Sequence, residues 1–264
     1  MPLPAESASP ASGNDRMKKL QGVFVTGTDT GVGKTRVACR MIRDLRAANV
    51  RVGAYKPVCS GADRQPDGQM VWDDLERLAA ALQRPGWQER ICPQRFLAPL
   101  APPLAARAEG RMIDDSLLIS GLEAWSAWSD FVVVEGAGGF LCPLTDTTHF
   151  GDLAVTIGFP VVIVARRGLG TINHTLLTIE AVRNRGLTIA GVILNSPNPQ
   201  DQDHSTPQNR HEIEQRGQVP ILGEWPYDLD ELSHRESGDC GIDWIKKCLF
   251  PFAEATSSPT GQGD

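Results

Sequence analysis

The sequence predicts an α/β protein in which helices cover both faces of a parallel central β-sheet. Two patterns support this fold class. Short apolar runs alternate with amphipathic stretches, as in βαβ units. Several of the runs, such as residues 131–134, are apolar at every position, which is typical of parallel strands buried on both sides. A glycine-rich segment at residues 27–35, described below, indicates which type of α/β fold this is.

The expected elements follow the chain in this alternating order. Six β-rich or apolar runs are predicted strands, namely residues 22–26, 51–55, 131–134, 161–165, 188–194 and 219–222. Stretches with apolar residues at helical spacing are predicted helices, namely residues 35–48, 74–82, 114–125, 171–185 and 242–249. Residues 61–71 and 196–208 are polar and contain proline, so we expect loops there. Residues 84–107 are rich in proline and are left unassigned.

The composition is that of one folded domain. The chain has 264 residues, of which 41% are hydrophobic and 22% charged. We expect a single domain over residues 20–252, with disordered tails at residues 1–19 and 253–264. The net charge of −6 argues against a nucleic-acid partner. No run of 18 apolar residues predicts a membrane helix, and no apolar segment near the N-terminus predicts a signal peptide, so a cytoplasmic protein without a membrane partner is expected.

The cysteines give no sign of a metal site. All six are scattered, and no C-x-x-C pair occurs among Cys39, Cys59, Cys92, Cys142, Cys240 and Cys248. We therefore expect reduced thiols that behave as small apolar residues.

A phosphate-binding loop is predicted at Gly27-Thr-Asp-Thr-Gly-Val-Gly-Lys-Thr35, between the first strand and the first helix. In such a P-loop, backbone N–H groups and the helix N-terminus face the phosphates. Lys34 would reach the β- and γ-phosphates, and the Thr35 hydroxyl would bind Mg²⁺. The match is imperfect, because Thr28 stands where the pattern has its first glycine. A glycine-rich turn without phosphate is the alternative interpretation.

An acidic residue at the end of another strand supports the nucleotide site. Residues 131–134 lead into Glu135-Gly-Ala-Gly-Gly139. An apolar strand that ends in an acid is the Walker B arrangement, which holds Mg²⁺ beside the P-loop. These features place the fold in the P-loop NTPase type.

Four segments together resemble the dethiobiotin synthetase family. They are GTDTGVGKT at residues 27–35, YKPVCSG at 55–61, VEGAGG at 134–139 and GLGTINH at 168–174, within a resemblance that spans about residues 20–230. The resemblance implies ATP- and Mg²⁺-dependent carboxylation of 7,8-diaminononanoate with CO₂. A carbamate is phosphorylated by ATP, and ring closure then gives dethiobiotin, ADP and phosphate. Because the substrate supplies both amines, no protein nucleophile is needed.

The resemblance also implies roles for individual residues. Lys56, Lys34 and Thr30 would be catalytic, and Thr35, Asp74 and Glu135 would bind the metal. Asp73 is an alternative to Asp74, although helical register favours Asp74 and leaves Asp73 as a helix cap. The nucleotide would be bound by Gly31, Val32, Gly33, Lys34, Thr35, Arg36, Asp74, Glu135, Gly136, Ala137, Gly138, Asn195, Pro226 and Tyr227, with Asn195 reading the base.

Substrate contacts are expected from two subunits. Ser60, Thr30 and Gly138 would contact the substrate within one chain. The helix that opens at residues 168–174 would bind the substrate carboxylate at the interface of a homodimer, with Leu169 and Asn173 contributed by the partner. We expect His174 to pack against or cap a helix rather than to act in catalysis, and the same holds for His149, His204 and His211.

Two other functions stay open from the sequence. One is a related P-loop amidoligase of the cobyrinate amidase type, which typically carries an added glutaminase domain. The other is a partitioning or septum-placement ATPase switch, which usually has a second lysine near the position of Asp29 and a C-terminal membrane helix. Diamine-dependent ATP hydrolysis distinguishes the synthetase from both.

Overall fold

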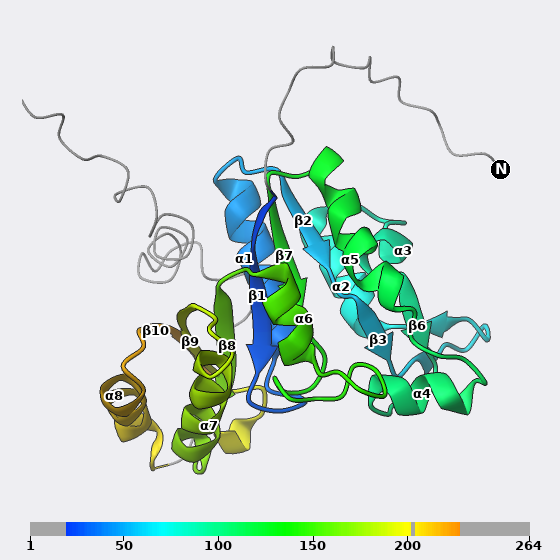
Figure 1. Cartoon of the computed structure of the whole chain (residues 1–264). Helices are drawn as coiled ribbons and strands as arrows, with labels where there is room; N and C mark the ends of the chain where they lie inside the picture. The colour runs from blue at the N-terminus through cyan, green and yellow to red at the C-terminus, as the bar shows by residue number, and fades with distance from the viewer. Residues whose placement is uncertain (1–19, 202–203, 228–264) are drawn as a thin grey trace, which may run out of the picture.

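A six-stranded parallel sheet forms the centre of the molecule (Figure 1). The structure is a computed structural model that describes residues 20–201 and 204–227. The strand order is β10-β9-β8-β1-β7-β2. These strands are β1 (Gln21–Gly27), β2 (Val52–Tyr55), β7 (Phe131–Glu135), β8 (Val161–Arg166), β9 (Ile189–Asn195) and β10 (Ile221–Trp225). The predicted fold class is confirmed.

Helices pack on both faces of this sheet. In Figure 1, α1 lies behind β1 and α6 lies in front of it. The helices are α1 (Lys34–Ala47), α2 (Asp73–Leu82), α3 (Gln88–Ile91), α4 (Pro102–Ala108), α5 (Asp115–Glu123), α6 (Phe150–Ile157), α7 (Thr171–Arg183) and α8 (Thr206–Gly217), with 3₁₀ turns η1 (Ala124–Ala127) and η2 (Pro199–Asp201). No helix in the described ranges is long and apolar enough to cross a membrane.

Two small strand pairs lie in or beside regions that the sequence leaves as loops or unassigned. β3 (Val58–Ser60) pairs in parallel with β6 (Gln94–Phe96), and β4 (Asp63–Arg64) pairs with β5 (Met70–Val71) in a short antiparallel hairpin. Within residues 61–71 the loop prediction is therefore only partly correct. Residues 196–208 likewise contain η2 and the start of α8.

All six predicted central strands are present, with small shifts at their ends. β10 begins at Ile221, two residues after the predicted start, because Pro220 has no N–H to donate to the sheet, although its carbonyl accepts from the Val192 N–H over 2.9 Å. Helices α3, α4, α6 and α8 were not predicted. The predicted helix over residues 242–249 and both predicted tails lie outside the described residues.

The core explains why these segments form a parallel sheet. Every side chain of β7 is buried, as are all residues of β1 after Gln21. β1 lies between β7 and β8 and pairs in parallel with both. The first helix places Val37, Met41 and Ile42 against the sheet, on one face of a 3.6-residue period. Because all strands run in the same direction, their carboxyl ends share one edge of the sheet.

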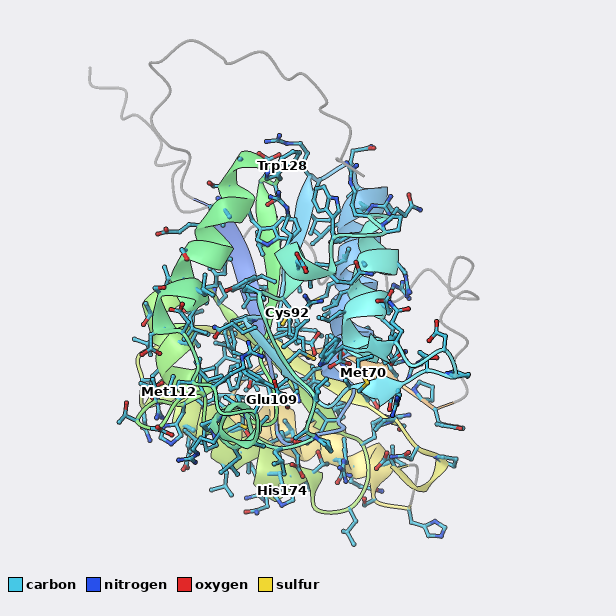
Figure 2. All side chains as sticks on the ribbon, turned by 90° about the vertical axis from the view of Figure 1, so that its right-hand side faces the viewer. Met70, Cys92, Glu109, Met112, Trp128 and His174 are labelled. Carbon is cyan, nitrogen blue, oxygen red and sulfur yellow. The ribbon has the colours of Figure 1, made fainter. Side chains whose placement is uncertain are left out.

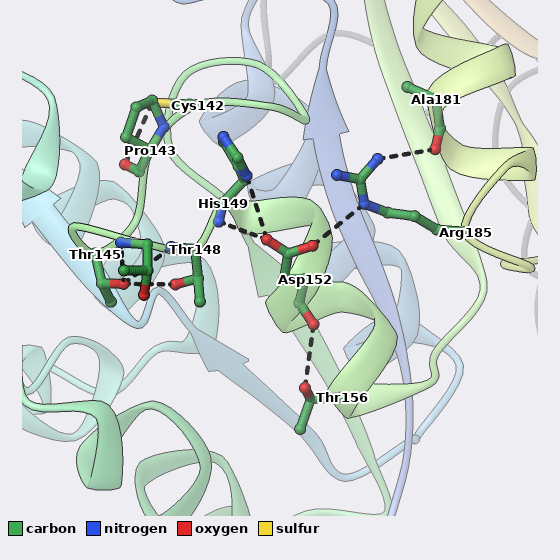
Figure 3. Close-up of polar contacts among 10 residues, drawn as sticks. Cys142, Pro143, Thr145, Thr148, His149, Asp152, Thr156, Ala181 and Arg185 are labelled. Carbon is green, nitrogen blue, oxygen red and sulfur yellow. Dashed lines mark hydrogen bonds and ion pairs between the residues drawn. The ribbon is translucent and has the colours of Figure 1, made fainter.

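Helix α6 begins with a reciprocal cap that is drawn in Figure 3. The backbone N–H of His149 donates to Asp152 Oδ2 over 2.8 Å, and His149 Nδ1 lies 3.3 Å from the same oxygen. Arg185, which follows α7, donates to Asp152 Oδ1 over 3.3 Å. His149 therefore caps a helix, as expected from the sequence. The hydrogen bond from the His149 N–H, aided by Arg185, holds the pKa of Asp152 below its ordinary value.

Replacing Asp152 with alanine is expected to lower the free energy of unfolding by about 1 kcal/mol at pH 7, the usual cost of losing a helix cap. A carboxyl whose pKa is lowered in the folded state stabilises above its unfolded pKa and loses this contribution as the pH falls through its folded pKa. The difference in stability between the variant and the native protein should therefore shrink as the pH falls below the unfolded pKa and vanish below the folded one. Urea unfolding at pH 7 and at a series of lower pH values measures this difference. Asp115→Ala, in the first turn of α5, is the matched control, and an equal loss there would contradict a specific cap at Asp152.

Candidate active site

The carboxyl ends of β1, β2, β7 and β9 bring the predicted motifs together. The P-loop follows β1, Lys56 follows β2, Glu135 ends β7 and Asn195 ends β9. Register fixes their proximity, because Tyr55 pairs with Val134 and Val25 pairs with Glu135. Figure 2 shows Trp128, which precedes β7, at one end of the molecule, and His174, in the first turn of α7, at the other.

An open cavity of about 680 Å³ lies at this edge. Most of the residues predicted to bind nucleotide, metal or substrate line it, namely Thr30, Gly31, Gly33, Lys34, Thr35, Arg36, Lys56, Ser60, Asp74, Glu135, Ala137, Gly138, Asn195 and Tyr227. Other predicted residues are absent from its wall, namely Val32, Gly136, Pro226, Leu169 and Asn173. Val32 and Gly136 are buried, and the N–H of Gly136 donates to the carbonyl of Val25 over 3.0 Å.

The P-loop folds back over its own lysine. Lys34 Nζ donates to the carbonyl oxygen of Asp29 over 3.0 Å. A Cβ added at Gly27 would lie 3.1 Å from Lys34 Nζ and 2.9 Å from the Asp29 carbonyl oxygen. A side chain at residue 27 is therefore excluded, which explains a glycine one position before the usual place. Burial, together with the charge of Lys56, lowers the pKa of Lys34 to about 8.

Three oxygen-bearing side chains converge below the loop. Thr35 Oγ1 lies 2.7 Å from Asp74 Oδ1 and 2.7 Å from Glu135 Oε1. One hydroxyl proton can satisfy only one of these carboxylates. Glu135 Oε2 is buried and has no hydrogen-bond partner among the described residues. A buried carboxylate oxygen without a partner is costly, so this arrangement fits a bound cation.

The donor chemistry suits Mg²⁺. The described part of the chain contains no group of three or more His, Cys, Asp or Glu residues able to hold a metal. Mg²⁺, however, is commonly bound through one or two carboxylates together with substrate phosphates. Asp74, Glu135 and the Thr35 hydroxyl supply hard oxygen atoms of that kind next to the P-loop.

Lys56 is buried between the same two carboxylates. Its Nζ lies 2.6 Å from Glu135 Oε1 and 2.7 Å from Asp74 Oδ2. Burial alone would lower the pKa of Lys56, but Glu135 and Asp74 outweigh it and hold that pKa well above its ordinary value. The same ion pair, against the opposing effect of burial, lowers the pKa of Asp74. The site therefore keeps a fixed cation at the end of β2.

The structure distinguishes the two adjacent aspartates at the start of α2. Asp74 contacts Thr35 and Lys56, whereas Asp73 Oδ2 lies 3.7 Å from Arg77, and its side chain is 70% exposed. The prediction that Asp73 caps the helix is wrong. Trp72 occupies the N-cap position, and no side-chain cap bond forms there, because the Asp73 carboxylate lies outside, beside Arg77.

Asn195 contacts the P-loop from the end of β9. Its Nδ2 donates to the carbonyl oxygen of Val32 over 2.8 Å, and its Oδ1 accepts from Arg36 Nη1 at 3.0 Å. Tyr227, 48% exposed, lies on the same cavity wall. The predicted base-binding residues Asn195 and Tyr227 are thus both at the cavity, while Pro226 lies beside it.

Sequence reasoning missed part of the cavity wall. Ser60 Oγ donates to the carbonyl oxygen of Leu100 over 2.7 Å, and the whole segment 99–102 lines the cavity. Cys59, Arg77, Cys142 and Pro197 also line it. Residue 59 lies inside a recognised motif, and Arg77 lies one helical turn after Asp73, so these two could have been found from the sequence. The segment 99–102 carries no such signal.

Leu169 and Asn173 lie outside the cavity of their own chain. Leu169 is 87% exposed in the loop before α7, and Asn173 is exposed in the first turn of that helix. Gly170 precedes α7 in the left-handed conformation, at a φ of 89°. The structure therefore does not bring this pair to the P-loop within one chain.

The fold and this site define a P-loop nucleotide-binding protein. The AAA domain family matches residues 21–234. The ATP-dependent dethiobiotin synthetase BioD of Anaeromyxobacter dehalogenans strain 2CP-1 is 49% identical over 195 residues, which cover 74% of this chain and 84% of that protein. BioD 1 of Escherichia coli K12 is 37% identical over 81% of this chain and 94% of its own length. The chain belongs to the dethiobiotin synthetase family and is therefore an enzyme, a ligase that makes dethiobiotin.

A solved structure gives the same fold at low identity. The septum site-determining protein MinD from Pyrococcus horikoshii, complexed with Mg-ADP, is 14% identical, with a TM-score of 0.50 over 89% of this chain and 98% of that one. This similarity concerns the fold alone. The sequence relatives, in contrast, support a synthetase rather than the ATPase switch considered above.

Proposed function

We propose that the chain carries out ATP- and Mg²⁺-dependent ring closure of 7,8-diaminononanoate with CO₂. The products are dethiobiotin, ADP and phosphate. One observation favours this reaction over ATP binding without carboxylation. A buried lysine, Lys56, stands at the end of β2 between the two acids of the phosphate site, in the same cavity as Ser60. A fixed cation there suits a reaction in which a carboxylate-like group attacks a phosphate.

The proposed reaction has three steps. One substrate amine adds to CO₂ and loses a proton, which gives a carbamate. A carbamate oxygen then attacks the γ-phosphorus of ATP, ADP leaves, and a carbamic-phosphoric anhydride results. The second amine attacks the carbonyl carbon and loses a proton, phosphate leaves, and the cyclic urea is closed. The protein supplies position and charge rather than a nucleophile.

Individual residues would act as follows. The backbone N–H groups of residues 31–35 hold the phosphates, and Lys34 neutralises the β- and γ-oxygens. Lys56 faces the carbamate and the transferred phosphoryl group, and Ser60 and Thr30 position the diamine. Thr35, Asp74 and Glu135 would hold Mg²⁺, which neutralises charge on the triphosphate when bound. Asn195, Pro226 and Tyr227 would surround the base.

The proposal includes a homodimer with shared active sites. Leu169 is 87% exposed and Leu177 is 56% exposed, and both lie at or on α7, as does the exposed Asn173. Apolar side chains exposed on one helix favour burial against another subunit. In that dimer, Asn173 and the start of α7 would bind the substrate carboxylate opposite the partner's P-loop.

The proposal also includes a single domain over residues 20–252 and a cytoplasmic location.

The direct test is product formation. Purified protein with ATP, Mg²⁺, bicarbonate and 7,8-diaminononanoate is expected to yield dethiobiotin, detected by mass, and one phosphate per product. Removing the diamine should stop phosphate release. Hydrolysis at an equal rate without the diamine would contradict the synthetase function and favour an ATPase switch.

Subunit mixing tests the shared site. Lys56→Ala and Asn173→Ala homodimers are each expected to have low activity, because each lacks one side of every site. Mixed dimers contain one site with both native residues, so mixing should restore up to about a quarter of native activity under random pairing. Lys56→Ala mixed with Lys34→Ala, two residues from the same side, is the matched control, and its mixed dimers should stay inactive. No restoration in the first mixture, or equal restoration in both mixtures, would contradict the proposed arrangement.

A further inference from the structure

Both the nitrogen and the oxygen of the Asn195 side-chain amide form hydrogen bonds within the protein. Asn195 is the last residue of β9, and its relative exposure is 0%. Nδ2 donates to the carbonyl oxygen of Val32 over 2.8 Å, across 163 positions of sequence. Oδ1 accepts from Arg36, in the first turn of α1. One side chain thus joins the sheet edge, the P-loop backbone and the helix that the P-loop opens.

The P-loop approaches Asn195 so closely that a side chain cannot stand between them. A Cβ added at Gly33 would lie 2.0 Å from Asn195 Nδ2 and 3.2 Å from its Cγ. Real Cβ atoms do not come within 2.0 Å of another heavy atom outside their own bonds, so the loop backbone packs directly on the amide. The Val32 side chain on the other side is fully buried. The loop conformation at residues 32–33 is therefore defined by contact with Asn195.

Arg36 supports the amide from the outside. Its guanidinium lies 5.9 Å from the ring centroid of Trp225, at the end of β10. Trp225 pairs in register with Asn195 in the neighbouring strand. The side-chain amide is thereby fixed between the carbonyl of Val32 and a cation that is itself placed on an aromatic ring.

We propose that Asn195 is a positioning residue that braces the P-loop and so strengthens phosphate binding whatever base the nucleotide carries. This inference rests on the proposed nucleotide site. The carbonyl of Val32 precedes the N–H groups of Gly33 and Lys34 directly. Fixing that peptide orients the following N–H groups before any phosphate arrives, which lowers the entropic cost of binding. A residue that only reads the base would leave these groups unaffected.

The experiment compares ligands with and without a base. Binding of Mg-ATP, Mg-GTP and inorganic tripolyphosphate is measured by calorimetry for the native protein and for Asn195→Ala. All three affinities should fall by a common factor of about tenfold or more, because in the variant the peptide that follows Val32 must be ordered when the phosphates bind. Loss of ATP affinity with tripolyphosphate binding unchanged would overturn the brace and leave Asn195 as a base reader.

Two further variants sharpen the result. Asn195→Asp keeps an acceptor for Arg36 but loses the donor to Val32, so its tripolyphosphate affinity should fall as in the alanine variant. Tyr227→Ala, on the exposed cavity wall, should leave tripolyphosphate binding unchanged. Hydrogen exchange of the nucleotide-free protein gives an independent measurement, and in Asn195→Ala the amides of residues 31–34 should exchange at least about tenfold faster. Unchanged exchange there would also overturn the proposal, whereas a native protein that binds none of the ligands would contradict the nucleotide site itself.

Discussion

Replacing Lys56 with methionine is expected to lower kcat by about 10²- to 10³-fold, the usual effect of removing one fixed group that stabilises a developing charge. The affinity for Mg-ATP should change by no more than a few-fold. Lys56 Nζ contacts Glu135 and Asp74 and no P-loop atom among the hydrogen bonds of the described residues. Lys34 and the P-loop amides, which would bind the triphosphate, stay in place in the variant. Calorimetry and single-turnover phosphate release separate the two effects.

The stability of this variant needs its own control. Removing one partner of a buried ion pair leaves the other charge uncompensated, and this costs about 3–5 kcal/mol. Lys56→Arg keeps the charge and should retain stability, yet the broad guanidinium cannot place its charge as the ammonium does. We expect a folded Lys56→Arg protein with normal ATP affinity and low kcat. Collapse of ATP affinity in a folded Lys56 variant would mean that this lysine binds nucleotide instead.

The same contacts predict competition between Lys56 and a divalent cation. Mg²⁺ at Asp74 and Glu135 would share the carboxylate oxygens that Lys56 contacts at 2.7 and 2.6 Å. Lys56 balances the charge of these two carboxylates, and a metal ion held by the same oxygens would compete with its ammonium for them.

The fold could be predicted because its central strands are continuous apolar runs. Residues 131–134 and 161–165 have all their side chains buried, and burial on both sides leaves a strong pattern. Helix α8 left no such pattern, because TPQNRHEIEQRG contains one large apolar residue, Ile213, and its packing depends on α7. Helix α6 is short and apolar on most sides, and a run of that kind cannot be told from a strand by periodicity.

The residues of the candidate site also differ in whether the sequence could predict them. Residues in contiguous motifs, such as Lys34 and Glu135, could be predicted because local backbone geometry determines where they point. Asp74 was favoured over Asp73 because Leu75 and Leu78 then match the apolar positions of the resembled family, and Asp74 does contact Thr35 and Lys56. The contact from Asn195 to Val32 could not be predicted, since it depends on how β9 and the loop after β1 approach in space. The segment 99–102 reaches the cavity only through the pairing of β3 with β6 and the contact of Leu100 with Ser60.

Replacing Gly33 with alanine is expected to weaken Mg-ATP binding at least about 100-fold, which corresponds to about 2.7 kcal/mol. Its φ is 95°, in the left-handed region, where an L side chain costs about 1–2 kcal/mol. The new methyl group would also stand 2.0 Å from Asn195 Nδ2. The loop and the amide must move apart, and the bond to the Val32 carbonyl is expected to break. The phosphate-binding N–H groups would then lose their orientation.

The variant Gly31→Ala distinguishes the effect of backbone strain from the effect of the contact between Gly33 and Asn195. Gly31 has a φ of 71°, so alanine there carries a similar backbone strain, yet a Cβ added at this position would meet no heavy atom of the described residues within 4 Å beyond its chain neighbours. In urea, Gly31→Ala should lose about 1–2 kcal/mol of unfolding free energy from backbone strain, and Gly33→Ala should lose more, because its methyl group also disturbs the contact between Asn195 and Val32. Only Gly33→Ala should lose tripolyphosphate affinity and show fast exchange at residues 31–34. Equal loss of tripolyphosphate affinity in both variants would mean that strain alone determines the loop, and that its contact with Asn195 adds nothing to phosphate binding.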